Sequence, residues 1–128
     1  MHPNEQVLRD VDKAQQAGDI DTFLGFFTDD VVMHVTGRSS LAGDYKGKDQ
    51  VFGFFGKLME LTDGTSKVEV HDLLANDEHG VAVVKESGTR NGRSHEGNAT
   101  HVFHIRDGKV TEFWDAQVDQ YAADEFWA

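Results

Sequence analysis

Apolar residues recur at helical spacing in three stretches of the N-terminal half. These stretches are residues 4–19, 19–30 and 48–64. In each, apolar positions return every three or four residues, which predicts a helix with one buried face. Gly18 stands where the first helix should end, and Asp19 can cap the second. The apolar positions are Val7, Leu8, Val11, Ala14, Ile20, Phe23, Leu24, Phe27, Val51, Phe54, Phe55, Leu58 and Leu61.

The other half of the pattern is typical of β-strands. We expect strands in residues 31–35, 66–76, 81–90, 94–105 and 110–118. Turn signals separate the last four of them, including Asn91-Gly92 and Asp107-Gly108. Residues 36–47 are rich in Gly and Ser and are expected to form a loop. Because the helices come first and the strands follow, the sequence predicts an α+β fold, with three helices covering one face of a curved, mostly antiparallel sheet.

Alternation along the last hairpin decides which of its polar side chains point inward. A two-residue turn at Asp107-Gly108 would place His101 opposite Trp114. A type I turn followed by a left-handed Gly108 bulge would place His101 opposite Asp115 instead. We favour the bulged turn, because it sorts the hairpin better into an apolar and a polar face. The inner set is then His101, Phe103, Ile105, Phe113 and Asp115, and the outer set includes Thr100, Val102, His104, Val110, Glu112 and Trp114.

An inward Asp115 beside His101 points to acid/base chemistry. A carboxylate on an apolar face is costly unless it is paired, hydrogen-bonded or open to a wet pocket, and such a pair is typical of general acid/base sites. Other interpretations stay open at this point. Asp115 could cap a turn at the strand end, and His101 could be a core histidine bonded to a carbonyl. His34 could face either the pocket or solvent.

Composition and charge narrow the classes of function. With 128 residues the chain is long enough for one domain, residues 1–128. The net charge of −11 disfavours binding to nucleic acid and to anionic membranes. The chain has no cysteine and starts without the apolar core of a signal peptide, so we expect a cytoplasmic protein. No His-x-x-x-His pair occurs, and we expect neither a metal site nor a cofactor.

Three segments carry a family resemblance over nearly the whole chain. They are "QAGDIDTFLGFFTDDVVMHV", "GRSSLAGDYKGKDQV" and "VFHIRDGKVTEFWDAQVDQYAADEFWA". They resemble the SnoaL-like branch of the nuclear transport factor 2-like superfamily, which also contains ketosteroid isomerases. The resemblance implies a cone-shaped fold whose sheet wraps around a pocket. SnoaL-like polyketide cyclases use an aspartate on the last strand and a histidine on the strand before it, and Asp115 and His101 stand at those places.

The chain lacks two residues that the ketosteroid isomerases of this superfamily use for catalysis. Their oxyanion tyrosine in the first helix corresponds to Val11 here, and their base at the end of the first strand corresponds to Val35. The resemblance therefore does not extend to the steroid isomerase machinery.

Two functions of different classes follow for the sequence. The first is a cofactor-independent acid/base enzyme acting on a small apolar cyclic or polyketide-like carbonyl compound, with Asp115 and His101 catalytic. The second is a noncatalytic module that binds a small apolar ligand. The expected ligand-binding residues in both cases are His34, Phe23, Phe27, Phe54, Phe55, Phe103 and Phe113. The apolar outer set of the hairpin predicts a homodimer, as the resemblance also implies. The last ten residues are expected to form a tail docked through Phe126 and Trp127.

Overall fold

The computed structural model describes residues 1–128 as four helices and one six-stranded sheet. The helices are α1 (Pro3–Gln16), α2 (Ile20–Gly25), α3 (Gly47–Leu61) and α4 (Gln120–Phe126). The strands are β1 (Phe27–Val35), β2 (Gly43–Lys46), β3 (Lys67–Ala75), β4 (His79–Arg90), β5 (Arg93–Arg106) and β6 (Lys109–Gln117). None of these helices has the length and hydrophobicity that a membrane-spanning segment requires.

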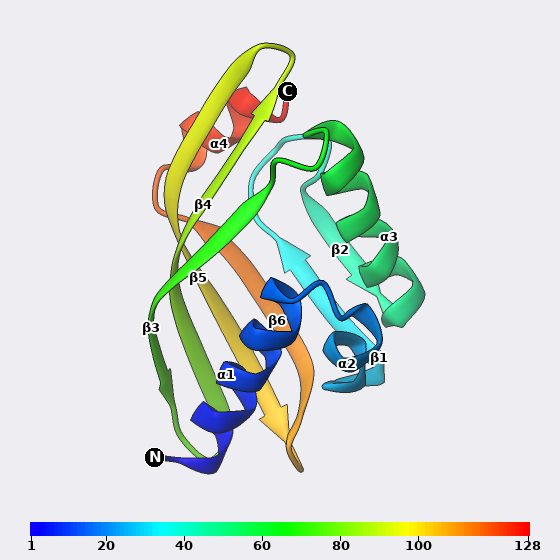
Figure 1. Ribbon diagram of the computed structural model, residues 1–128, viewed down its shortest axis with the longest axis vertical. Coiled ribbons are helices and arrows are strands. Elements are labelled where there is room, and N and C mark those ends of the chain that lie inside the picture. The colour runs from blue at the N-terminus through cyan, green and yellow to red at the C-terminus, as the bar shows by residue number, and fades with distance from the viewer.

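The sheet is curved, and α1, α2 and α3 lie together on one of its faces (Figure 1). Its strand order is β2-β1-β6-β5-β4-β3, and every neighbouring pair is antiparallel except β1 with β6. Helix α1 contacts β3 and β4, whereas α3 contacts β1 and β2. The α+β architecture predicted from the sequence is confirmed.

A cluster of large apolar side chains joins the helices to the inner face of the sheet. Phe27 and Phe113 stack with ring centroids 5.5 Å apart, and Phe103 stacks on Phe113 at 5.7 Å. Phe23 meets Phe27 edge to face at 5.0 Å. These phenylalanines are nearly inaccessible to solvent, so this part of the cone is packed core and not open space.

Three segments differ from the sequence-based expectation. Strand β1 begins at Phe27, which the helical pattern had assigned to the second helix. Residues 43–46 form the short edge strand β2 inside the expected loop. The expected tail is helix α4, capped at its start by the Asp119 side chain. Phe126 is buried and Trp127 is half-buried, so both serve as the anchors that the sequence predicted.

The last hairpin has the predicted pairing but reaches it by a different turn. His101 lies opposite Asp115 and Phe103 opposite Phe113, as expected. The turn itself, however, has two residues, Asp107 and Gly108, both with positive φ, as a type I′ turn requires. The extra residue lies in β6, where the register shifts between the pairs His104–Glu112 and Ile105–Val110.

The shifted bulge corrects one outward assignment. Val110 was expected on the outer face, but it is fully buried opposite Ile105 in the core. The physical reason is that a bulge reverses the alternation only for the residues beyond it. Val110 lies between the turn and the bulge, so it keeps the alternation of the unbulged hairpin.

Replacing Gly108 with alanine is expected to destabilise the protein by about 1 kcal/mol, because a β-carbon is disfavoured at its φ of 77°. No atom lies within 4 Å of the added carbon, so the effect isolates the backbone conformation. Chemical denaturation measures it. Gly56→Ala in α3 is the matched control: its β-carbon also meets nothing, its φ is not positive, and the change should stabilise the helix. Equal effects of the two changes would contradict the turn.

Candidate active site

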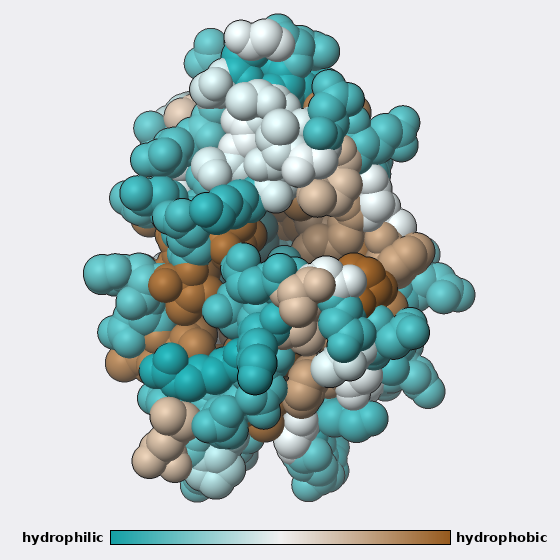
Figure 2. Space-filling model, viewed as in Figure 1, coloured by the Kyte–Doolittle hydropathy of each residue, from teal (hydrophilic) through white to brown (hydrophobic).

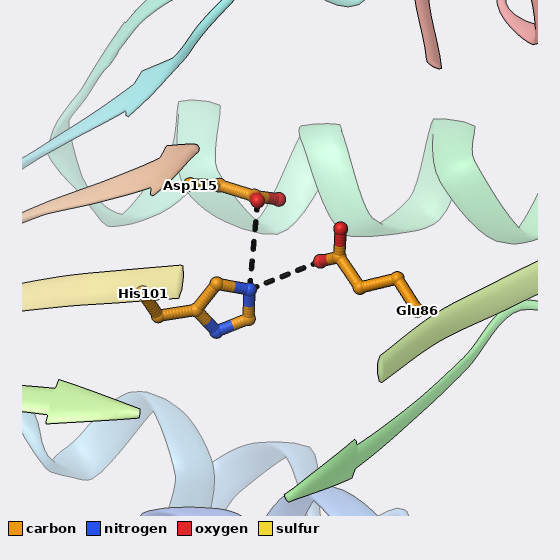
Figure 3. A group of neighbouring side chains, drawn as sticks. All are labelled: Glu86, His101 and Asp115. Atoms are coloured by element: carbon orange, nitrogen blue, oxygen red, sulfur yellow. Dashed lines mark hydrogen bonds and ion pairs between the residues drawn. The ribbon is translucent and has the colours of Figure 1, made fainter. Parts of the chain in front are cut away.

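Three ionisable side chains from neighbouring strands meet on the inner face of the sheet (Figure 3). They are Glu86 of β4, His101 of β5 and Asp115 of β6. The Nε2 atom of His101 lies 3.0 Å from Oε2 of Glu86 and 3.6 Å from Oδ1 of Asp115. The first contact is a hydrogen bond, and the second is an ion-pair contact longer than a hydrogen bond. Each of the three side chains is only 18–19% exposed.

Strand register brings the three groups together. Asp115 is the direct cross-strand partner of His101. Glu86 of β4 pairs with Gly97, which precedes His101 on β5. Glu86 therefore shares the inner face with His101, and its side chain extends along the sheet to the imidazole. Gln117 completes the network from β6: its amide nitrogen donates to Glu86 Oε1 and, at 3.3 Å, to Asp115 Oδ1.

The environment separates the pKa values of the three groups. Burial would lower the pKa of His101, but the negative charges of Asp115 and Glu86, together with the hydrogen bond to Glu86, outweigh it and raise that pKa to about 10. Burial would raise the pKa of Glu86, yet its hydrogen bond to His101 and the imidazolium charge hold it below the usual value. For Asp115, burial dominates, and the negative charge of Glu86 adds to it, so its pKa is raised despite His101. At neutral pH, Glu86 and His101 therefore form an ion pair, and Asp115 is the carboxyl poised to exchange a proton.

A cavity of about 60 Å³ adjoins this cluster. Asp115, Glu86 and Gln117 line it, whereas His101 lies behind them and does not. Figure 2 views the molecule from the side of α1 and α3 and shows a recess with hydrophobic residues at its rim. The apolar part of the lining is Val35, Leu41, Phe54, Leu58, Val68, Ala123, Phe126 and Trp127. A largely apolar pocket with a few convergent polar groups is the usual form of a small-molecule site.

Among the residues expected to bind a ligand, only Phe54 borders the cavity. The other five phenylalanines lie in or against the core: Phe23, Phe27, Phe55, Phe103 and Phe113. Their side chains point inward as predicted, but they pack in or against the core and do not line the cavity.

His34 lies on the opposite face of the sheet. Its two ring nitrogens contact Asp44 and Glu112, each at 2.6 Å, and its ring stacks on Trp114. The pocket role expected for His34 does not fit this position, because alternation along β1 places it outward between the inward Met33 and Val35.

The ligand atoms of Glu86, His101 and Asp115 lie within 4.8 Å of one another, a spacing that a metal ion could bridge. Spacing alone does not make a metal site here. Because the pKa of His101 is raised, its imidazole is protonated at neutral pH, and a metal would have to displace the Nε2 proton.

Glu86, Gln117 and His95, which all line the cavity, are not singled out by the sequence analysis. A signal for Glu86 was present. Asn91-Gly92 is a two-residue turn with both φ values positive, and that turn alone fixes Glu86 on the same face as His101.

Comparison with known proteins identifies the family of this chain. The SnoaL-like domain model matches residues 8–113, which include Glu86 and His101 and end just before Asp115. An uncharacterised protein of Mycobacterium tuberculosis strain H37Rv is 30% identical over 112 residues, covering 87% of this chain and 86% of its own. Bal32a, from a soil-derived mobile gene cassette, superposes with a TM-score of 0.93 at 30% identity, covering 98% and 97% of the two chains.

More distant structures share the fold. TerC, co-crystallised with polyporic acid, superposes with a TM-score of 0.84 at 19% identity, and the match covers 98% of each chain. With a family model spanning most of the chain and relatives of similar length at 30% identity, this chain belongs to the SnoaL-like domain family.

Proposed function

We propose that the protein is a cofactor-independent acid/base enzyme acting on a small apolar cyclic or polyketide-like carbonyl compound. One observation carries this proposal: Asp115 is a carboxyl group with a raised pKa that faces the cavity beside an ion pair. A general base works best when its pKa lies near the working pH, and the surroundings of Asp115 shift its pKa in that direction.

The proposed reaction starts at a carbon next to the substrate carbonyl. The Asp115 carboxylate takes the proton from that carbon, and the electrons of the broken C–H bond form an enolate. In an isomerase, the same proton returns to another carbon of the enolate. In a cyclase, the enolate carbon attacks a second carbonyl, and protonated Asp115 gives its proton to the new alkoxide. His101 stays protonated between Glu86 and Asp115, and its positive charge stabilises the negative charges of these two carboxylates.

The size of the cavity bears on how a ligand enters. At about 60 Å³ it is well below the roughly 150 Å³ of an engineered cavity that holds benzene. Phe126 and Trp127 of the α4 region form one wall. A ring-sized ligand would have to displace part of this wall. The co-crystal of TerC with polyporic acid supports a small-molecule ligand for this fold.

A noncatalytic binding module is the second candidate. The small cavity and the phenylalanine-filled interior favour it, because a packed cone can keep the fold without offering room for turnover. In that case the Glu86–His101 pair would serve stability or ligand affinity only.

One experiment separates the two candidates. The chain has two tryptophans, so a Trp114→Phe variant leaves Trp127 at the cavity as the sole tryptophan reporter. The fluorescence of this variant is recorded while cyclohex-2-enone, 1-tetralone and 2-tetralone are added, and exchange of the α-protons of these ketones by the parent protein in D₂O is followed by ¹H NMR. Exchange faster than in buffer supports the enzyme. A fluorescence change without exchange supports the binding module, and neither signal counts against both for this class of ligand.

We also propose a homodimer formed through the outer face of the sheet. Helices α1, α2 and α3 all pack on the inner face of the sheet. The outer face carries half-buried apolar side chains, including Val81, Val83, Val102 and Trp114. Light scattering is expected to give twice the 14.3 kDa of one chain. Val102→Lys should shift the mass to that of a monomer. Phe52→Lys, on the exposed side of α3, should not. A monomeric parent protein at micromolar concentration would contradict this assembly.

A further inference from the structure

An enolate-forming reaction needs a group that stabilises the substrate oxygen, and His101 is not placed for this task. Its Nε2 atom is directed at Glu86 and Asp115 (Figure 3), and the residue does not line the cavity. Gln117 lines the cavity, but its amide nitrogen is already shared between the same two carboxylates. The electrophile of the proposed reaction must therefore come from another part of the wall.

His95 is a histidine of the cavity wall whose ring nitrogens have no hydrogen-bond partner in the protein. It lies on β5 opposite Gly88, and the alternation along β5 places it on the inner face with His101. It is half-buried, and its ring stacks on Phe126 with centroids 5.1 Å apart and planes at 25°. Whichever tautomer the imidazole adopts, it keeps one N–H donor for a molecule in the cavity.

The glycine at position 97 lets this imidazole lie close against the backbone of β5. A β-carbon on Gly97 would lie 3.1 Å from His95 Nε2 and 3.8 Å from Gln117 Oε1. The imidazole and the side chain of Gln117, which donates a hydrogen bond to Asp115, therefore both lie next to Gly97. A side chain at position 97 would push against the imidazole edge, so glycine here has a steric function that does not depend on φ.

We propose that His95 is a catalytic residue that donates a hydrogen bond to the carbonyl oxygen of a flat cyclic ketone while Asp115 exchanges the α-proton. This inference rests on the proposed function and supplies its missing electrophile. The oxygen would lie in the cavity that His95 and Asp115 both line, and the ring of the substrate would extend toward the apolar residues Phe54 and Trp127 of the same cavity. As the enolate forms, negative charge gathers on the oxygen, and a donor aimed at that atom is worth more in the transition state than in the ground state.

The competing explanation is that His95 only packs against Phe126 and holds α4 in place. Two substitutions separate packing from donation. His95→Phe keeps an aromatic ring for the stack but removes the donor. His95→Gln keeps a donor but removes the ring. His71→Gln is the control, because His71 is exposed on β3 and has no side-chain partner.

The measurements are α-proton exchange of 1-tetralone and 2-tetralone, the melting temperature, and the ¹⁵N shifts of the labelled histidine rings during titration with each ketone. His95→Phe is expected to melt near the parent protein and to lose about 10²-fold in exchange rate. His95→Gln should lose less activity despite a lower melting temperature. In the parent protein, the ring resonance that disappears in His95→Phe should shift when ketone is added.

The outcomes distinguish this inference from the proposed function. Full exchange activity in His95→Phe overturns the role of His95 and leaves the acid/base function standing. A ketone-induced shift of the His95 resonance without any exchange supports His95 as a carbonyl-binding group and overturns the enzyme. A His95 resonance that does not move with either ketone overturns the inference.

Discussion

Replacing Asp115 with asparagine is expected to lower the rate of α-proton exchange by about 10²-fold or more while leaving the fold intact. Asparagine keeps the size of the side chain and can remain within the network of Gln117 and Glu86, but it cannot accept a proton from carbon. The loss should appear in kcat more than in KM, because the substrate is still bound by the same walls. Steady-state kinetics on whichever ketone the parent protein exchanges provides the measurement.

The control for this substitution is Asp30→Asn. Asp30 is exposed on β1 and has no side-chain partner, so the change removes one carboxylate from the molecule without touching the site. Its exchange rate and melting temperature should equal those of the parent. A parent-like rate in Asp115→Asn would mean that another carboxyl group takes the proton, and Glu86, which also lines the cavity, would be the next residue to test.

The last hairpin shows what sequence patterns can and cannot decide. The separation of apolar from polar side chains placed His101 opposite Asp115, and this pairing is confirmed. The turn inferred to produce it is wrong, because a two-residue turn with a separate bulge in β6 gives the same register beyond the bulge. Burial of one face selects a register strongly, whereas the position of the bulge depends on local backbone energies that hydrophobic alternation does not report.

Glu86 could have been found by the same reasoning applied one hairpin earlier. Residues 81–84 are all apolar, and such a run hides which face of a strand is inward. Asn91-Gly92, however, is the strongest short signal for a two-residue turn, and counting back from it sets Glu86 on the face of His101. The inward position of Glu86 could thus be predicted from the residues of the turn, although not from the alternation within β4.

The extent of the cavity could not be predicted from the sequence. Alternation tells which face of a strand points inward, but not how far along the strand the packed core ends and the cavity begins. Phe103 and Phe113 point inward beside Phe27 and are core, while Asp115 and Gln117, further along the same face, border the cavity. The cavity is also lined by α4, whose seven residues are too few for a clear helical period.

Removing the positive charge of His101 is expected to destabilise the protein by about 3–5 kcal/mol at pH 7. His101→Gln would leave Glu86 and Asp115 as neighbouring buried carboxyl groups without their cation, and breaking a buried ion pair from one side has an effect of this size. The double variant Glu86→Gln/His101→Gln should recover much of the loss, because it removes the uncompensated charge as well. Urea denaturation at one fixed protein concentration measures all three proteins.

The same ion pair predicts how stability depends on pH. The pKa of His101 is raised from 6.5 to about 10 in the folded protein. A histidine with a raised pKa stabilises the fold fully below pH 6.5, loses that contribution as pH rises, and contributes nothing above about pH 10. Between these limits the folded state holds more protons than the unfolded state, so the free energy of unfolding should fall with pH, by at most about 1.4 kcal/mol per pH unit from this group. His101→Gln should lack this part of the slope. If the parent protein and His101→Gln lose stability equally between pH 7 and 10, then His101 is neutral in the fold, and Asp115 does not face the charged ion pair on which its proposed role depends.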